Sequence, residues 1–551
     1  MTTFLKFILP VLLFSYQLGF AQTNSSANRK TISNLKEHIS YLASDSLEGR
    51  RAGTKGEALA QQYIITQFKK IGLEPKGADG FYQPFSIYGG KQINRSTYLI
   101  INGDSLTINK DFFPFPFSAN SSLVAAPIVS VQEISMPWFF DLKTILEENK
   151  TNPHFDLNEA ILSTIKKESQ KGPSAIIFFN SSEIEDGLAF ESKNKTSLFE
   201  IPVLYLTKGI IKKYLSDDSA TLNIDLKVDV GEIKRRAGNI IGYIDNSAAT
   251  TVVLGAHFDH LGYGEDGNSM LRTSEKLIHN GADDNTSGTA ALIELARKLK
   301  SSTLKNNNYL FIAFSAEELG LIGSKYFTEN PTIELTRTNY MINLDMVGRL
   351  NDSLNSITVG GFGTSPQWNS IINEANKKNS FALKFDSSGT GPSDHTSFYR
   401  KDIPVLFFFT GLHTDYHKPG DDFEKINYRG ETRLISFIYK IILNTNYTNQ
   451  KLVFAKTREA QTTTSARFSV SMGIMPDYSY SGAGVRCDGI SEGRPAQKAG
   501  IRTGDVILQI NDYEISSVES YMQVLGKFKK GDRVIVKYSR SGETLITEVQ
   551  F

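Results

Sequence analysis

The sequence predicts an α/β fold: a mixed, mainly parallel sheet with helices on both faces, a β-rich inserted domain and a small C-terminal domain. Apolar runs such as NIIGYI, TVVLGA, YLFIAF, YMINLD and IPVLFFF alternate with helical segments within residues 236–445, as is typical of parallel sheets. Short β-like runs separated by turn residues fill residues 96–235. A polar stretch at 446–466 precedes a compact tail, which indicates a linker and a separate domain.

The composition excludes several classes of protein. The chain has 551 residues, 60 Lys and Arg, 59 Asp and Glu and a net charge of +1, so no bulk charge favours nucleic acid or anionic lipid. A single cysteine, Cys487, excludes an internal disulfide, a Cys-rich zinc site and an iron–sulfur cluster. Any metal must therefore be held by His, Asp and Glu.

Residues 1–21 are typical of an export signal. Lys6 precedes an apolar run that ends at Phe20, and Gly19 and Ala21 are small residues of the kind that signal peptidases accept. The run is short and polar residues follow it, so we expect no stable membrane anchor; the alternative is an uncleaved anchor. We expect an exported protein, periplasmic or secreted.

An amphipathic helix opens the main domain. Apolar side chains recur at helical spacing from Ala58 to Ile71, and Gly72 ends the pattern. We assign residues 30–95 and 236–445 to this domain and residues 96–235 to an insertion within it.

Reactive side chains follow two of the predicted strands. TVVLGA runs into His257 and Asp259, which project to the same side because strand side chains alternate, so the carboxylate can orient the imidazole. YLFIAF is followed by Glu317 and Glu318, an acidic pair that is costly to bury without a cation. Open α/β sheets place their sites at this edge.

Neighbouring segments supply further candidates. Asp284 precedes a helix, Asp345 ends the run YMINLD, and Tyr416 and His417 lie in the loop after IPVLFFF. Each residue taken alone could have an ordinary structural role, as a helix cap, a strand end or a loop residue. Their occurrence together within 257–417 predicts a metal site with nitrogen and oxygen ligands, a set that suits Zn²⁺.

In this order the motifs resemble the M28 family of metallopeptidases, the co-catalytic zinc aminopeptidases. They are His-x-Asp, Gly-Ala-x-Asp-Asn-x-Ser-Gly, Ala-Glu-Glu-x-Gly-Leu-x-Gly-Ser, Asn-Leu-Asp-Met and Tyr-His-x-Pro-x-Asp, and the text LASDSLEGRRAGTKGE near the N-terminus is also similar. The resemblance implies a zinc exopeptidase-like fold with two Zn²⁺ per chain. The implied ligands are His257, Asp284, Glu318, Asp345 and His417.

The resemblance also implies a role for each residue. Asp284 would bridge the two metals and Glu317 would be the general base. Asp259 would orient a metal-binding histidine, and Tyr416 would donate a hydrogen bond to the oxyanion. Two metals about 3.5 to 4 Å apart lower the pKa of a bridging water. We therefore expect hydrolysis of N-terminal residues from peptides, with Glu317 carrying the proton to the leaving amine.

Three alternatives differ from this interpretation. A carboxypeptidase or dipeptidase of the same family differs only in its pocket residues. A glutaminyl cyclase-like enzyme shares the fold and uses one zinc, so the five-ligand set argues against it. An inactive peptidase–PDZ scaffold would bind partners only, and the presence of Glu317 argues against it.

Other polar residues of this region are assigned supporting roles. Asp394 and His395 lie in the loop GTGPSDHTSF and either line the substrate cleft or belong to ordinary loop structure. We expect His260, His279 and His413 to make local hydrogen bonds rather than to bind metal.

The remaining two regions resemble known modules. Residues 96–235, with GPSAIIFFN followed by IPVLYLTKGI, resemble a protease-associated domain that either restricts the cleft or stabilises the fold. Residues 467–551, with MGIM and GVRCDGISEGRPAQKAGIRTGDVILQINDYEI, resemble a PDZ domain, a small β-barrel-like fold. This implies a C-terminal peptide or protein ligand; the alternative is a domain that packs on the peptidase and binds nothing.

Overall fold

The computed structural model describes most of the chain. The residues described are 26, 28–152, 155–194, 196–271, 275–377, 380–448, 450–457, 470–476, 480, 482–490, 493–516, 518–529 and 531–551. The predicted export signal at 1–21 and the second half of the predicted linker lie outside them. No helix in the described part of the chain is long and apolar enough to cross a bilayer.

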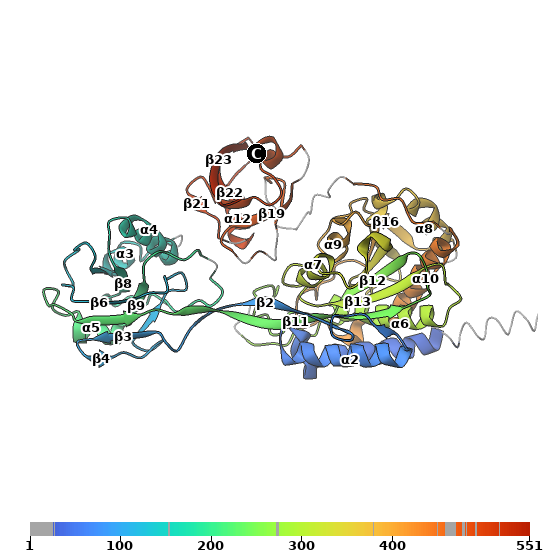
Figure 1. Cartoon of the computed structure of the whole chain (residues 1–551), viewed down its shortest axis with the longest axis horizontal. Helices are drawn as coiled ribbons and strands as arrows, with labels where there is room; N and C mark the ends of the chain where they lie inside the picture. Colours follow the sequence, from blue (N-terminus) through green and yellow to red (C-terminus); the bar gives the residue numbers. More distant parts are fainter. Residues whose placement is uncertain are drawn as a thin grey trace, which may run out of the picture.

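A nine-stranded mixed sheet forms the centre of the main domain (Figure 1). Its order is β1-β11-β13-β12-β14-β17-β15-β16, and β2 pairs with β11. The pairs β12·β13, β12·β14 and β14·β17 are parallel, whereas β11·β13 is antiparallel. The strands are β1 (Glu74–Pro75), β2 (Tyr82–Ile93), β11 (Val230–Ile244), β12 (Thr251–His257), β13 (Asn308–Phe314), β14 (Thr338–Leu344), β15 (Ser356–Gly360), β16 (Ala382–Phe385) and β17 (Val405–Phe409).

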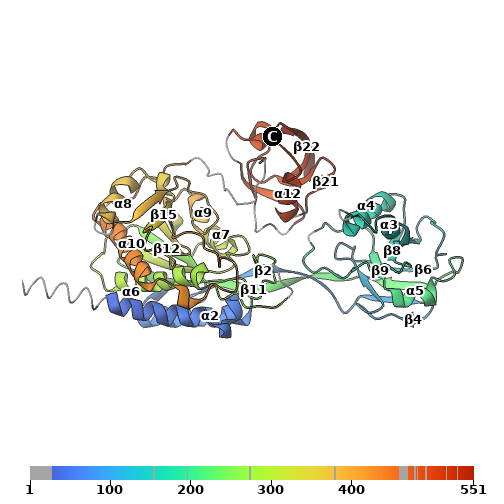
Figure 2. The same ribbon diagram turned by 180° about the vertical axis from the view of Figure 1, so that it is seen from behind.

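Helices cover both faces of this sheet, as the sequence predicts (Figures 1 and 2). Val252 and Leu254 of β12 pack in one core with helices α2, α6, α8 and α10, whereas Val253 packs in a second core with α7 and α9. Burial on both faces explains why the strands are continuous apolar runs. The helices are α2 (Lys55–Ile71), α6 (Gly288–Lys300), α7 (Ile322–Glu329), α8 (Trp368–Asn376), α9 (His395–Tyr399) and α10 (Tyr428–Thr448).

The predicted end of the amphipathic helix at Ala58–Ile71 is confirmed. Helix α2 ends at Ile71, and Gly72 caps it with φ 81°, a left-handed conformation that glycine adopts without steric cost.

A long antiparallel ribbon of β2 and β11 connects the sheet to the inserted domain (Figure 1). The predicted boundary between 235 and 236 falls inside β11, because the strand continues while its burial changes from alternating to complete. The inserted domain contains the sheets β4-β3-β10-β6 and β5-β9-β8-β7 and its own apolar cores. Its elements are β3 (Tyr98–Ile101), β4 (Asp104–Ser105), β5 (Phe112–Pro114), β6 (Ser122–Ala125), β7 (Pro137–Asp141), α3 (Lys143–Glu148), α4 (Leu157–Ser169), β8 (Ala175–Phe179), β9 (Val203–Leu206), α5 (Lys208–Tyr214) and β10 (Ile224–Lys227).

The first half of the predicted linker belongs to the main domain. Helix α10 continues to Thr448, and residues 450–457 pack along the domain: Leu452 is buried and its N–H donates to Asn339 Oδ1 (2.8 Å). The stretch 446–466 is mainly polar, which favoured the linker prediction although it contains the buried Leu452.

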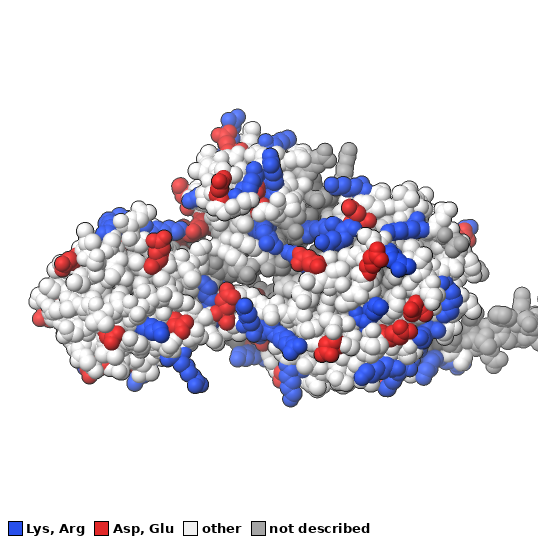
Figure 3. All heavy atoms as spheres, viewed as in Figure 1, with Lys and Arg blue, Asp and Glu red and all other residues white. Residues whose placement is uncertain are grey.

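The C-terminal domain has a separate sheet and core, which contains the buried Cys487. Lys/Arg and Asp/Glu side chains are interspersed over the face of the molecule in Figure 3, in agreement with the net charge of +1. The elements of this domain are β18 (Ile474–Pro476), β19 (Val485–Ile490), α11 (Pro495–Lys498), β20 (Val506–Ile510), β21 (Tyr513–Glu514), α12 (Val518–Leu525), β22 (Arg533–Arg540) and β23 (Glu543–Gln550).

Candidate metal centre

The residues predicted to bind metal meet at the carboxyl ends of the parallel strands. His257 ends β12, Asp345 follows β14, and Glu318 follows β13. Asp284 lies in the turn at Ala282–Ser287 that leads into α6, and His417 lies in the loop after β17. Because these strands run in the same direction, their ends reach the same edge of the sheet.

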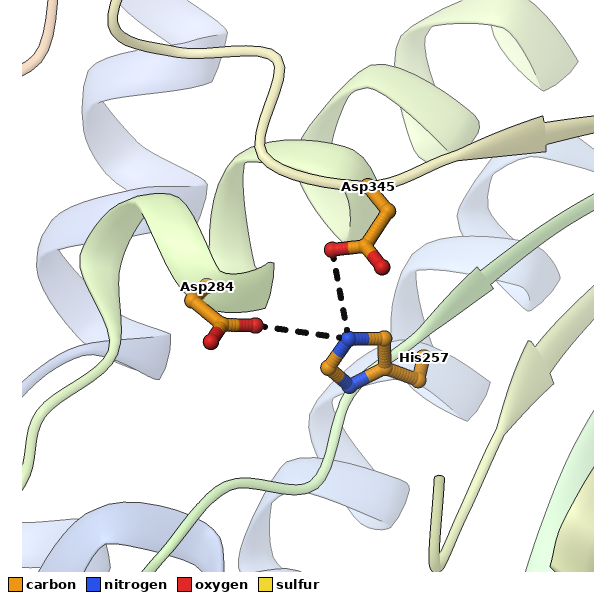
Figure 4. A group of neighbouring side chains, drawn as sticks. All are labelled: His257, Asp284 and Asp345. Atoms are coloured by element: carbon orange, nitrogen blue, oxygen red, sulfur yellow. Dashed lines mark ion pairs between the residues drawn. The ribbon is translucent and has the colours of Figure 1, made fainter. Parts of the chain in front are cut away.

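The first group of candidate ligands surrounds His257. Its Nε2 lies 3.4 Å from Asp284 Oδ1 and 3.4 Å from Asp345 Oδ1 (Figure 4). His257 Nδ1 lies 3.2 Å from the backbone oxygen of Asp259, which accepts the Nδ1 proton and leaves the Nε2 lone pair free for a metal.

A second group lies on the other side of Asp284. His417 Nε2 is 3.2 Å from Asp284 Oδ2 and 3.3 Å from Glu318 Oε2. His417 Nδ1–H donates to the backbone oxygen of Asn268 (2.8 Å), which leaves Nε2 free in the same way. The two carboxylate oxygens of Asp284 therefore face different groups, the arrangement that a bridging ligand requires.

His260 lies closer to the second group than the sequence suggested. Its Nδ1 is 2.8 Å from Glu318 Oε1 and 4.0 Å from Asp284 Oδ2. The hydrogen bond with Glu318 agrees with a local role, but the same geometry makes His260 a further candidate ligand beside His417. His260 directly follows Asp259 in the sequence, so it lies next to the His-x-Asp segment at the end of β12.

The charges of the centre are strongly coupled. Burial alone would lower the pKa of His417, but Glu318 and Asp284 raise it to about 11. Burial would raise the pKa of Asp284, but hydrogen bonds from His257 and His417 hold it well below its usual value. Among the protein groups alone, imidazolium protons supply the positive charge that stabilises these carboxylates.

The predicted general base lies beside the first group. Glu317 Oε2 is 3.8 Å from His257 Nε2. Burial raises the pKa of Glu317 well above its usual value, and the charges of Asp345 and Asp394 add to the shift.

Asp259 supports the centre in a different way from the prediction. Its carboxylate lies 3.8 Å from His257 Nδ1, and its Oδ1 accepts a hydrogen bond from the backbone N–H of Glu317 (3.1 Å). It therefore fixes the start of the acidic pair, while its backbone oxygen orients the imidazole.

The predicted oxyanion donor packs on a metal-ligand candidate. The rings of Tyr416 and His417 stack with centroids 4.0 Å apart. Burial and the charges of Asp284 and Glu318 raise the pKa of Tyr416 above its usual range, so its hydroxyl remains a donor near neutral pH.

Several supporting residues escaped the sequence analysis. Asp421, the last residue of the Tyr-His-x-Pro-x-Asp motif, accepts hydrogen bonds from the backbone N–H groups of Asp283 (2.9 Å) and Asp284 (3.0 Å). Ser393 Oγ donates to Asp345 Oδ2 (2.7 Å). Both residues stand inside quoted motifs, so the signal was present, but only the fold shows which ligand each one holds.

The other singled-out residues lie around the centre. Asp394 and His395 are buried, and His395 stacks on Phe407. Neither carboxylate oxygen of Asp394 has a hydrogen-bond partner in the described structure, and its charge acts on Glu317. His279 bonds with Ser269 Oγ (2.7 Å).

His413 lies outside both groups of candidate ligands. Its Nε2 is 3.3 Å from Asp283 Oδ2 and 4.0 Å from Asp421 Oδ1.

The residues present fit divalent zinc. The predicted ligands are two imidazoles and three carboxylates, and Asp345 Oδ1 is buried without a hydrogen-bond partner in the described structure. Among the described residues, ligand atoms close enough to share one metal belong to two groups, His257 with Asp284 and Asp345, and His260 with Asp284 and Glu318. Zinc binds imidazole nitrogen and carboxylate oxygen and leaves positions open for water.

Two family models match parts of this chain. Residues 239–442 match the model of peptidase family M28, and residues 470–551 match that of the PDZ domain. "Aminopeptidase YwaD" of Bacillus subtilis is 34% identical over 157 residues, which are 27% of this chain and 34% of the relative. "Leupeptin-inactivating enzyme 1" of Streptomyces exfoliatus is 34% identical over 173 residues, 29% of this chain and 37% of the relative. The matches thus span little more than a third of these relatives.

Solved structures with similar topology include two bacterial aminopeptidases. The zinc aminopeptidase BSAP of Bacillus subtilis is 21% identical with a TM-score of 0.43, covering 78% of this chain and 96% of that one. The aminopeptidase of an Aneurinibacillus strain is 20% identical with a TM-score of 0.42, covering 78% and 96%.

Proposed function

We propose that this chain, in which residues 239–442 form a peptidase family M28 domain and residues 470–551 a PDZ domain, is an exported zinc-dependent aminopeptidase. Export is proposed from the apolar N-terminal segment, and removal of N-terminal residues from peptides from the names of the relatives. Two zinc ions per chain would be held by His257, Asp284, Glu318, Asp345 and His417.

The observation that carries the proposal is the position of Asp284 between two imidazoles. Its Oδ1 lies near His257 and its Oδ2 near His417, at 3.4 and 3.2 Å. This two-sided arrangement favours a dinuclear centre and argues against the mononuclear, cyclase-like alternative.

The side chains around this centre have complementary tasks. Bound zinc would polarise the scissile carbonyl and lower the pKa of the attacking water. Glu317 would accept the proton of that water and deliver it to the leaving amine, a transfer that its raised pKa favours. The hydroxyl of Tyr416 would donate to the carbonyl oxygen as negative charge develops there.

The PDZ domain offers an edge for a second peptide. Strand β18 is the end strand of its sheet in the described residues, and Gly473 precedes it with φ 78°. An extended C-terminal segment of a peptide or protein can add to such an edge. We propose this class of partner for residues 467–551.

Hydrolysis of matched free and N-acetylated peptides tests the proposed function. We expect release of free amino acids from the unblocked peptides, loss of this activity with a chelator and recovery with Zn²⁺. Equal cleavage of both peptide sets would contradict an aminopeptidase, and release from the carboxyl end would support the carboxypeptidase alternative instead.

A further inference from the structure

One carboxylate lies where three parts of the chain meet, outside the group of ligands. Asp266 stands in the loop 261–271, is 9% exposed and accepts a bidentate pair from Arg51, Nε at 2.6 Å and Nη2 at 2.9 Å. Arg235 Nη2 of the ribbon strand β11 lies 3.5 Å away. The third cation, Lys193 Nζ, belongs to the inserted domain and contacts Asp266 Oδ1.

Lys193 is itself fixed to the ribbon. The neighbouring Ser192 accepts a hydrogen bond from the N–H of Lys91 on its backbone oxygen (2.7 Å), and its Oγ donates to the oxygen of Lys91 (2.5 Å). The inserted domain therefore reaches the catalytic domain at a defined point.

The loop held by Asp266 orients one half of the candidate metal centre. Asn268, two residues further, accepts the Nδ1 proton of His417 on its backbone oxygen (2.8 Å) and donates from Nδ2 to the backbone oxygen of Glu318 (3.3 Å). The N–H of Met270 donates to the backbone oxygen of His417 (2.9 Å). These contacts are with the second group of ligands, whereas Asp345 is held by Ser393 from another loop.

We propose that Asp266 is a positioning residue for the metal held by His417 and Glu318, and that Lys193 makes the inserted domain part of this support. The inference deepens the proposed function and rests on it only for the presence of two metals. The charged cluster fixes the loop, the loop fixes the tautomer and direction of His417, and this direction sets the affinity of one of the two sites.

Charge alone predicts a different result for Lys193, which makes the proposal testable. Removal of a cation near a metal site strengthens metal binding by electrostatics, whereas loss of loop support weakens it. Lys193 is 50% exposed, so its replacement leaves the core of the protein intact.

Stepwise zinc titration of the metal-free full-length chain, followed by calorimetry, tests the proposal. The variants are Asp266→Asn and Lys193→Met. Their controls are Asp505→Asn, which removes a bidentate pair with Arg540 in the C-terminal domain, and Lys208→Met, which removes an exposed pair with Glu185 in the insertion.

We expect Asp266→Asn to weaken one of two zinc-binding steps about 10-fold, as loss of a residue behind a metal ligand does. Lys193→Met should weaken the same step about 2- to 3-fold, because Lys193 is half-exposed and Arg51 still holds Asp266. The other step and both controls should keep the wild-type affinities.

Unchanged or tighter zinc binding by Lys193→Met would overturn the role of the inserted domain. An equal loss at both steps in Asp266→Asn would indicate general destabilisation and overturn the positioning role. If the wild-type protein binds zinc in two steps but has no aminopeptidase activity, the proposed function is refuted and this inference still holds. The two failures are therefore distinguishable.

Discussion

Asp284 concentrates the electrostatics of the centre in one side chain. Its carboxylate is buried, and both oxygens face imidazoles that hold its pKa well below the usual value. Asp421 fixes the turn from behind by accepting two backbone N–H groups, and burial beside Asp283 raises its own pKa to about 7. A buried group of this charge is stable only with matching positive charge, which divalent cations would supply.

Replacement of Glu317 separates metal binding from proton transfer. We expect Glu317→Gln to retain both zinc ions and to lose about 10²- to 10⁴-fold in kcat, because the amide cannot accept the proton. Steady-state kinetics with metal analysis measures both quantities. The matched control is Glu329→Gln at the exposed end of α7; similar turnover by the wild type and Glu317→Gln would remove Glu317 as the base.

Glu57 predicts a pH dependence of stability. Burial raises its pKa to about 7, against the hydrogen bonds from Ser315 and Gly53 that lower it. The ordinary pKa of the Glu57 carboxyl is 4.5, whereas its pKa in the folded protein is about 7. Between these pH values the unfolded chain has lost the proton and the folded protein still holds it, so the free energy of unfolding falls as pH rises. Above about pH 7 the folded protein has also lost the proton, and the destabilisation by the buried charge is complete.

The variant Glu57→Gln should remove this penalty. We expect its free energy of unfolding, relative to the wild type, to increase between about pH 5 and pH 7, by at most about 3 kcal/mol. Chemical denaturation at several pH values measures this difference. A difference that is constant with pH would show that Glu57 does not titrate in this range.

At the scale of elements, most of the main domain could be predicted because its signals are local. Buried parallel strands read as apolar runs, and helix α2 ends at a glycine. The ends of the strands, where His257 and Asp345 lie, followed from the same pattern. Supporting contacts such as Ser393 with Asp345 join residues far apart in the chain, and no periodicity encodes them.

The segment 450–457 shows how a linker prediction fails. The stretch 446–466 is mainly polar, but its part 450–457 contains the apolar run Leu452–Ala455. Thr457 Oγ1 accepts a hydrogen bond from the N–H of Gly389 (2.9 Å), and the N–H of Thr457 donates to the hydroxyl of Tyr399 (2.9 Å). Gly389 belongs to the loop that carries Ser393, so the segment stabilises the surroundings of Asp345.

Two truncations test this assignment. A chain that ends at Thr457 should retain small-peptide hydrolysis, because the PDZ domain lies beyond it. A chain that ends at Thr448 should be less stable by about 2 to 5 kcal/mol, since it loses the buried Leu452 and the bonds of Thr457. Thermal unfolding and activity assays compare the two; equal stability would return residues 450–457 to the linker.

At the scale of the whole molecule, the main domain, the insertion and the C-terminal domain have separate cores, and the candidate metal centre lies in the main domain. The matches of residues 239–442 to the M28 model and of residues 470–551 to the PDZ model agree with the sequence-based prediction, whereas the likeness of 96–235 to a protease-associated domain stays a prediction. The ribbon of β2 and β11 and the cluster at Asp266 connect the insertion to the main domain. The total charge of the chain is near neutral, but His, Asp and Glu are concentrated in the candidate metal centre within residues 257–417.

The most direct test of the dinuclear centre is the zinc content of the full-length chain, measured with Asp345→Ala and Asp284→Ala as variants. A dinuclear centre predicts about two zinc ions in the wild type, about one in Asp345→Ala, which loses a ligand of one site, and less than one in Asp284→Ala, which loses the ligand shared by both. A wild-type chain that binds a single zinc ion, or an Asp284→Ala variant that retains two, would contradict it.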